Sequence, residues 1–196
     1  MNANVLIVGV GGQGTILASD ILAAAALEAG LDARKSEIHG MSQRGGSVSS
    51  HVRFSPRVFS PVIPDGEADI LVALEEMEAA RWLGMLKPGA RLIISGTRIL
   101  PVGAAEYPEG IVPALIKNGY TCTYISPEVL HARAGGMKYE NVCILGLLSR
   151  LLDFPDSAWY AAIERLVPTG SFEANRAAFD AGRVHDDSDT KDRLST

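Results

Sequence analysis

Two loops near the start of the chain hold the residues whose types and spacing could do chemistry. The first, Gly9-Val10-Gly11-Gly12-Gln13-Gly14, follows an apolar run and satisfies the pattern G-x-G-x-x-G. This is the context of a dinucleotide-binding loop, because glycines permit a tight turn and let an anion approach N–H groups at a helix N-terminus. The same glycines would also let a strand and a helix pack closely with no ligand. Both interpretations stay open on this loop alone.

The residues that would select a cofactor for this loop are basic. An acidic side chain that binds ribose is expected about 20 residues after the loop. Arg34 and Lys35 occur there instead, flanked by Asp32 and Glu37. The two cations would suit a 2′-phosphate, so an NADP-dependent Rossmann reductase is one alternative function. A stand-alone module that binds a nucleotide or coenzyme A is another.

The second loop spans residues 36–48 and reads SEIHGMSQRGGSV. Arg44 precedes two glycines, and its guanidinium could clamp a carboxylate or a phosphate through two parallel hydrogen bonds. We see no nucleophile–base pair and no metal-binding cluster in this loop. It therefore predicts docking or anion contact rather than bond-making. A structural ion pair between Arg44 and Glu37 is the alternative, and His39 is open to either a general-acid role or a structural hydrogen bond.

Composition narrows the classes of function. The 196 residues suit one domain, and 18 basic against 23 acidic side chains argue against a nucleic-acid binder. The first apolar run breaks at Gly9, far short of the roughly 20 residues that a membrane span needs, so we expect a cytoplasmic protein. The sequence has two cysteines, Cys122 and Cys143, whereas a standard iron–sulfur cluster takes four thiolates. We expect no metal on this chain.

Strand-like and helix-like segments alternate along the chain. This alternation predicts an α/β fold, a single Rossmann-like domain with a mostly parallel sheet flanked by helices. Residues 47–54 alternate between two faces and predict a half-exposed strand, and the proline-punctuated segment 57–63 is at best an edge strand. The other expected strands are 4–8, 32–38, 70–74, 91–95 and 120–125, and the expected helices are 12–30, 75–86, 111–118, 128–133, 139–153, 157–166 and 172–182. We place the domain at 1–183 and a polar tail at 184–196.

Four segments in this order resemble the γ-type domain of 2-oxoacid:ferredoxin oxidoreductases. Beside the two loops, Asn141–Gly146 (NVCILG) resembles that family's N-x-x-x-L-G helix. Asn175–Gly182 (NRAAFDAG) resembles its terminal N-x-x-A-F-x-x-G helix. The second loop is most similar to that of the separate small β subunits in the indolepyruvate branch. The resemblance covers Val5 to Gly182, and it implies a Rossmann-like partner domain.

The resemblance also implies an activity and a division of labour. Such enzymes oxidatively decarboxylate a 2-oxoacid, here an arylpyruvate such as indolepyruvate, with coenzyme A as co-substrate and ferredoxin as electron acceptor. A large α subunit would hold thiamine diphosphate, Mg and the 4Fe-4S clusters, so this chain alone would bind no cofactor and be inactive. Neither loop is assigned bond-making residues. The cleft-facing or partner-facing candidates are Glu37, His39, Gln43 and Arg44 of the second loop, with which Gly40 and Met41 are carried over. The first loop is carried over as facing the partner, and the loop candidates for cofactor binding are Gly9, Gly11, Gly12, Gln13, Gly14, Gly45 and Gly46.

Overall fold

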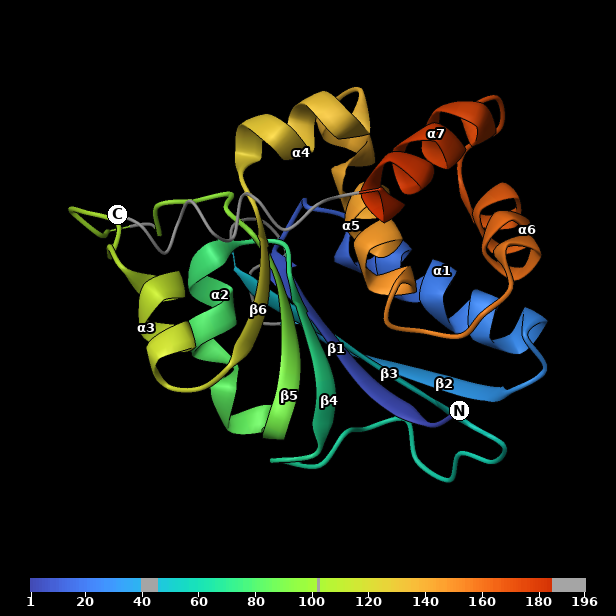
Figure 1. Cartoon of the computed structure of the whole chain (residues 1–196), viewed down its shortest axis with the longest axis horizontal. Coiled ribbons are helices and arrows are strands. Elements are labelled where there is room, and N and C mark those ends of the chain that lie inside the picture. The colour runs from blue at the N-terminus through green and yellow to red at the C-terminus, as the bar shows by residue number, and fades with distance from the viewer. Residues whose placement is uncertain (40–45, 102, 185–196) are drawn as a thin grey trace.

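The computed structural model describes residues 1–39, 46–101 and 103–184 and shows one six-stranded sheet (Figure 1). The strand order is β2-β3-β1-β4-β5-β6. Pairing is parallel from β1 through β4 and β5 to β6, whereas β3 runs antiparallel to both of its neighbours. The prediction of a mostly parallel sheet is confirmed. The strands are β1 (Ala3–Val10), β2 (Asp32–His39), β3 (Ser47–Ser55), β4 (Ala68–Ala73), β5 (Leu86–Ser95) and β6 (Thr121–Ile125).

Helices cover both faces of the sheet, as Figure 1 shows. The helices α1, α5, α6 and α7 lie on one face, and α2 and α3 lie on the other. The predicted α/β class is therefore confirmed. The α-helices are α1 (Thr15–Glu28), α2 (Glu76–Arg81), α3 (Ile111–Lys117), α4 (Pro127–Ala134), α5 (Glu140–Ser149), α6 (Asp156–Leu166) and α7 (Phe172–Arg183), and two short 3₁₀ helices are η1 (Leu83–Met85) and η2 (Met137–Tyr139).

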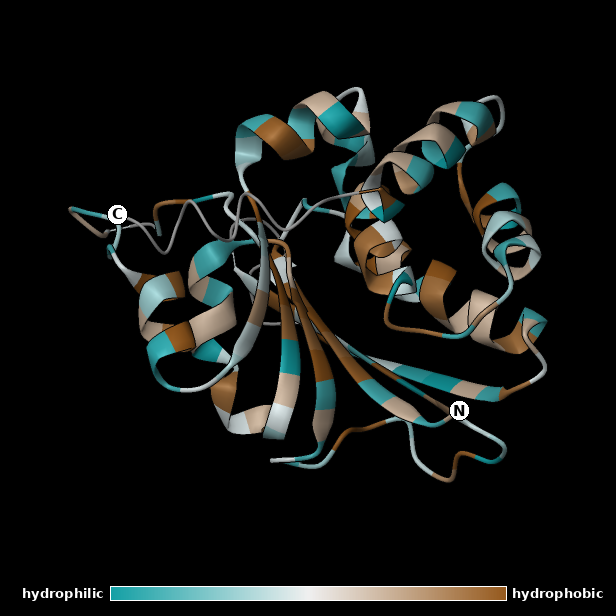
Figure 2. Cartoon of the chain, viewed as in Figure 1, coloured by the Kyte–Doolittle hydropathy of each residue, from teal (hydrophilic) through white to brown (hydrophobic). Residues whose placement is uncertain are grey.

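Two apolar cores explain why the central strands are hydrophobic on both sides (Figure 2). Successive strand side chains point to opposite faces. In β1, Val5 and Ile7 belong to the core beneath α1 and α5, whereas Leu6 and Val8 belong to the core beneath α2 and α3. All four side chains are fully buried, which places β1 at the centre of the molecule.

Two local expectations were wrong. The strand β3 is not half-exposed, because it lies between β2 and β1 and its polar residues Ser49, Ser50 and His51 are buried. The helix expected over 75–86 ends at Arg81, and Leu86 already begins β5. The segment 57–63, expected as at most an edge strand, forms no strand, in agreement with that expectation. For β3, the pairing with strands distant in the sequence decides the outcome.

The two helix motifs of the sequence meet in one tight crossing. A Cβ atom at Gly146 in α5 would overlap the carbonyl oxygen of Phe179 in α7, and one at Gly182 would overlap the carbonyl oxygen of Cys143. The two helices can pack this closely only because both positions lack a side chain. Asn175 is buried, and its Nδ2 donates to the carbonyl oxygen of Ser171 at 2.8 Å.

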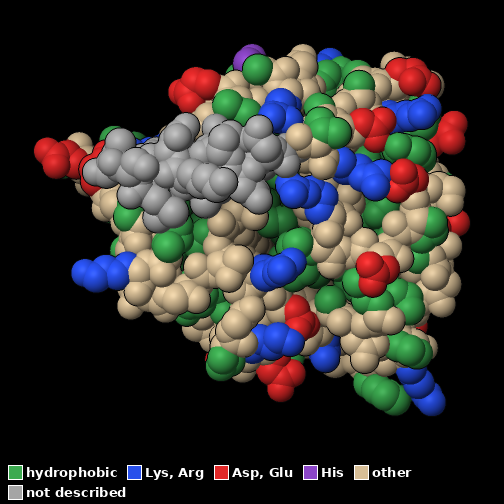
Figure 3. Space-filling view, in the orientation of Figure 1, with side chains coloured by type: hydrophobic (Ala, Val, Ile, Leu, Met, Phe, Trp, Pro, Cys, Tyr) green, Lys and Arg blue, Asp and Glu red, His purple; other side chains and the backbone are tan. Residues whose placement is uncertain are grey.

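The surface of the described residues mixes both signs of charge. On the face drawn in Figure 3, Lys and Arg side chains are interspersed with Asp and Glu side chains. The absence of a nucleic-acid partner stays a prediction.

None of the helices within the described ranges combines the length and the apolar character that crossing a membrane requires. The boundary at residue 183 also stays a prediction, since 185–196 lie outside the described residues.

Candidate functional site

The end of the second loop and the start of the glycine loop lie side by side at the carboxyl end of β1. Val10, the last residue of β1, pairs with Ser47, the first residue of β3. The N–H of Gly11 donates to the carbonyl oxygen of Gly46 at 3.0 Å. The glycine loop is therefore in contact with the base of the second loop. Of the predicted second-loop residues, Gly40, Met41, Gln43, Arg44 and Gly45 lie outside the described residues, and Glu37 and His39 lie in β2.

The glycine loop lies at the point where the chain changes from one face of the sheet to the other. The helix α1 follows β1 on one face, and α2 follows the neighbouring parallel strand β4 on the opposite face. In an open α/β sheet, a crevice forms outside the carboxyl ends of two such strands, and ligands bind there preferentially. The fold thus brings the predicted loops to the edge where a binding site is expected.

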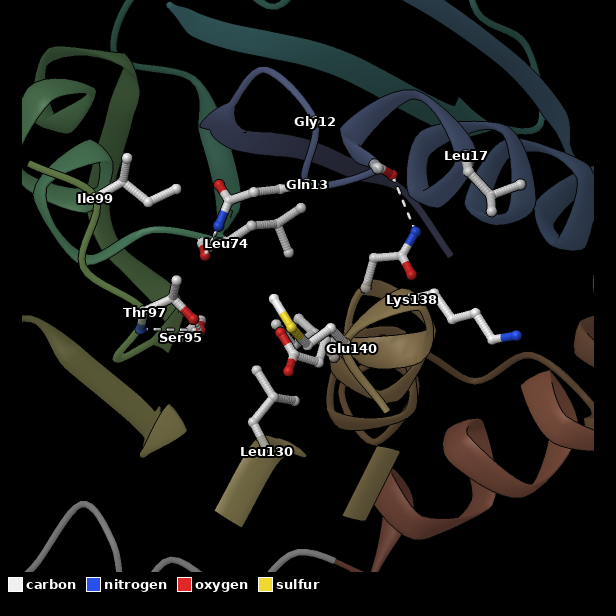
Figure 4. Close-up of a pocket in the computed structure, with 14 residues that line it drawn as sticks. Gly12, Gln13, Leu17, Leu74, Ser95, Thr97, Ile99, Leu130, Lys138 and Glu140 are labelled. Atoms are coloured by element: carbon white, nitrogen blue, oxygen red, sulfur yellow. Dashed lines mark hydrogen bonds between the residues drawn. The ribbon is translucent and has the colours of Figure 1, made fainter. Parts of the chain in front are cut away.

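A cavity of about 590 Å³ occupies this crevice, and we call it the switch-point pocket. Its walls come from the glycine loop, the carboxyl ends of β4 and β5, and the segment from α4 to α5 (Figure 4). This volume lies within the usual range of small-molecule sites. The residues that line it are Gly12, Gln13, Gly14, Leu17, Leu74, Ser95, Thr97, Ile99, Leu130, Met137, Lys138, Glu140, Asn141 and Ile144.

Gln13 spans the crevice with its side-chain amide. Its Nε2 donates to the carbonyl oxygen of Leu74 at 2.7 Å, and its Oε1 accepts the N–H of Val10 at 2.7 Å. The side chain therefore joins the carboxyl end of β1 to the residue that follows β4. A Cβ atom at Gly9 would lie 2.8 Å from Oε1 of Gln13, so this amide also explains the first glycine of the pattern.

Asn141 provides the second internal partner of the glycine loop. Its Nδ2 donates to the carbonyl oxygen of Gly14 at 3.2 Å, and its Oδ1 accepts the N–H of Val142 at 3.0 Å. Gly14 has a φ of 79°, and a Cβ atom there would overlap the amide of Asn141. The asparagine of the N-x-x-x-L-G motif thus packs directly on the glycine pattern. From the sequence, Asn141 was identified only as part of that motif, and this contact was missed because Gly14 and Asn141 are 127 residues apart.

The two basic residues that favoured NADP are bound elsewhere. Lys35 makes ion pairs with Asp20 and Glu37. Burial opposes the charge of Lys35, but its hydrogen bonds to these two carboxylates outweigh that effect and raise its pKa. Nε of Arg34 donates to the carbonyl oxygen of Val58 at 2.9 Å. Both cations therefore stabilise β2 against α1 and the 56–63 segment, and Glu37 shares that structural role.

Three carboxylates at the start of α2, those of Glu75, Glu76 and Glu78, are buried. Oε2 of Glu75 does accept the N–H of Glu78 at 2.9 Å, as expected at a helix N-terminus. Glu75 also accepts the hydroxyl of Tyr107 at 2.6 Å. Burial and this hydrogen bond raise the pKa of Tyr107. Glu76 pairs with Arg98 at 2.9 Å, and that hydrogen bond raises the pKa of the guanidinium.

Glu78 connects α2 to the base of the second loop. Its carboxylate accepts hydrogen bonds from Oγ of Ser47, from Nε1 of Trp82 at 3.1 Å and from Nε of Arg81 at 2.9 Å. The side chain of Glu78 is 3% exposed, so an ordinary surface role is excluded. Sequence reasoning missed this contact because Ser47 and Glu78 are 31 residues apart.

Metal-binding and thiol chemistry have little support in the part of the chain that the structure describes. No group of three or more His, Cys, Asp or Glu side chains among these residues could hold a metal ion. Burial raises the pKa of Cys122 to about 11 and that of Cys143 to about 12. Both therefore remain neutral thiols near neutral pH, whereas a reactive cysteine needs its thiolate form.

Comparison with known proteins identifies the family. Residues 4–184 match the family model described as pyruvate ferredoxin/flavodoxin oxidoreductase. The chain belongs to this family. It is 36% identical to the indolepyruvate oxidoreductase subunit IorB of Pyrococcus horikoshii, over 91% of this chain and 93% of that relative.

Two solved structures have the same fold. One is the gamma subunit of a keto/oxoacid ferredoxin oxidoreductase from Geobacter sulfurreducens, with a TM-score of 0.69, 26% identity and coverage of 93% of this chain and 94% of that chain. The other is a 2-oxoglutarate:ferredoxin oxidoreductase from Magnetococcus marinus with 2-oxoglutarate, coenzyme A and succinyl-CoA bound, with a TM-score of 0.74 and 20% identity. It covers 93% of this chain and 30% of that chain. Members of this fold thus occur as a separate chain and within a longer one.

Proposed function

We propose that this chain is the small subunit of a coenzyme A-dependent 2-oxoacid:ferredoxin oxidoreductase that acts on indolepyruvate and related arylpyruvates. One observation carries the proposal: the similarity to an indolepyruvate oxidoreductase subunit extends over 91% of this chain and 93% of that relative. The glycine loop and the base of the second loop also meet at one edge, as expected for a single functional surface.

The chemistry of the described residues supports a division of labour between two subunits. Four thiolates are needed for a standard 4Fe-4S cluster, whereas this sequence has two cysteines, one in β6 and one in α5. Its residues do not fit such a cluster. We therefore assign the clusters, thiamine diphosphate and Mg to a large α subunit, with ferredoxin as the acceptor and the cytoplasm as the site of action.

In this proposal, the carboxyl edge of the sheet is the surface that faces the α subunit. The glycine loop is already ordered by internal hydrogen bonds from Gln13 and Asn141, so it needs no ligand to hold its shape. A preformed surface favours association because less conformational freedom is lost on binding. Arg44 of the second loop, two residues before Gly46 in the sequence, is the residue that we propose for contact with the α subunit or with an anion.

The test uses this chain and its cognate large subunit, purified without oxygen. Together they should reduce ferredoxin when given indolepyruvate and coenzyme A, and each chain alone should not. Reduction with 2-oxoglutarate but not with indolepyruvate would contradict the proposed substrate. Oxidation of a 2-oxoacid by this chain alone, with a soluble pyridine nucleotide, would contradict the proposed subunit role.

The residues that suggested an NADP-dependent reductase make other contacts within the chain. Arg34 and Lys35 are bonded within the chain, and the glycines at 9 and 14 are explained by neighbouring amides. A fluorescence titration with NADPH should therefore show no saturable binding by this chain.

A further inference from the structure

The switch-point pocket presents a mainly apolar interior. Its polar side chains in the crevice bond one another or the backbone: Gln13 and Asn141 use their amides in the glycine loop, and the hydroxyl oxygens of Ser95 and Thr97 are 2.8 Å apart. An occupant would therefore contact mostly hydrocarbon. The apolar side chains of the wall are Leu17, Leu74, Ile99, Leu130, Met137 and Ile144.

The charge at this pocket disfavours an anionic occupant. Glu140 projects toward the cavity, whereas Lys138 points away from it (Figure 4). Oε1 of Glu140 lies 3.2 Å from Nδ1 of His131, and the Glu140 side chain is 23% exposed. The N-terminus of α1 would attract a phosphate or a carboxylate, but the carboxylate of Glu140 opposes that attraction. A neutral or cationic group complements this charge better.

Exposed apolar side chains neighbour the pocket along the chain. Met137 lines the cavity and is 77% exposed. Ile16 and Leu100 are 44% and 50% exposed and are adjacent in the sequence to Leu17 and Ile99 of the pocket wall. An exposed methionine in the wall of a hollow is typical of a protein–protein contact, because methionine adapts well to a partner surface.

We propose that the switch-point pocket receives an apolar side chain of the large α subunit, next to a basic residue of that subunit that pairs with Glu140. This inference rests on the proposed function. The apolar wall favours an apolar side chain of the α subunit, and the carboxylate of Glu140 favours a basic residue beside that side chain. A single side chain that fills a desolvated pocket often dominates the affinity of an interface. In the Magnetococcus marinus protein, the matched part is 30% of a longer chain, which agrees with a fold that works against other domains.

A bulky side chain in the switch-point pocket tests whether a side chain of the α subunit binds there. Leu17→Trp places an indole ring in the pocket wall. Leu27→Trp is the matched control on the same helix, about 15 Å further along its axis. The affinity of each folded variant for the purified large subunit is measured by biolayer interferometry. We expect Leu17→Trp to weaken binding at least about thirtyfold, as for the loss of a central anchor. Leu27→Trp should stay within about threefold of the unsubstituted chain, since surface changes of this kind alter little.

Reversing the charge at the pocket tests the basic neighbour. Glu140→Lys should weaken binding more than Glu140→Gln, and the difference should shrink as salt is added, because exposed charges are screened. Unchanged affinity of a folded Leu17→Trp variant would overturn the proposal. If that variant also has a raised KM for coenzyme A or the oxoacid, the pocket holds a small molecule instead. If the unsubstituted chain does not bind the large subunit at all, the proposed function fails as well.

Discussion

Replacing Gln13 with alanine tests whether its amide holds the two halves of the sheet together at the crevice. The substitution removes two hydrogen bonds of 2.7 Å, one to the carbonyl oxygen of Leu74 and one from the N–H of Val10. Leu74 and Val10 are 3% and 8% exposed, and a buried polar group left without a partner costs about 1–3 kcal/mol. The two groups together would cost about 2–6 kcal/mol if they stayed dry.

Water lowers that figure, because Gln13 forms part of the pocket wall and its removal opens a path to both groups. We therefore expect the free energy of unfolding to fall by about 1–3 kcal/mol. Urea unfolding, followed by far-ultraviolet circular dichroism, measures the change. Asn118→Ala is the control, since its exposed amide makes one bond of 2.8 Å to Ala114, and its effect should be under about 0.5 kcal/mol. A Gln13→Ala effect as small as that of the control would refute the role of the amide.

Three further substitutions follow from the same structure. Gly146→Ala should cost more than about 3 kcal/mol or prevent folding, because its Cβ would overlap the carbonyl oxygen of Phe179, whereas Gly84→Ala, with nothing within 4 Å, should be nearly neutral in a thermal melt. Tyr107→Phe should lower the free energy of unfolding in urea by about 1–3 kcal/mol, because the hydroxyl donates to Glu75 at 2.6 Å; an unchanged midpoint would contradict this. Arg44→Ala, a prediction from the sequence, should leave stability within about 0.5 kcal/mol yet weaken binding to the large subunit or turnover, and wild-type turnover would remove Arg44 from the site.

The spacing of apolar residues predicted most of the fold, because it indicates which side chains are buried. The run Val5–Val8 is apolar at every position, which is typical of a strand covered on both faces, and it forms the central strand β1. The strand β3 has small polar residues such as Ser49 and Ser50 that are just as buried. Alternation therefore predicted one exposed face, since a sequence does not state which strands lie on either side.

The site was only partly predictable for a different reason. The spacing of glycines indicated a tight strand-to-helix turn, and that turn is present. The sequence left open what fills the turn, because the deciding contacts come from Leu74, 61 residues after Gln13, and from Asn141, 127 residues after Gly14. Long-range contacts of this kind leave no local pattern.

A glycine fingerprint has two physical solutions, one in which a nucleotide packs on the glycines and one in which the chain's own side chains do, and Gly9 and Gly14 of this chain fit the second. In a dinucleotide site, the pyrophosphate occupies the space that the glycines leave open and bonds the backbone there. Here, the amides of Gln13 and Asn141 take up that space at Gly9 and Gly14. The loop then keeps its shape with no ligand, which a subunit needs if its edge must be ready to dock. The same fold accounts for 94% of a separate chain from Geobacter sulfurreducens and for 30% of a longer one from Magnetococcus marinus. An edge ordered from within would work in either setting, because neither the ligand nor the covalent connection has to form it.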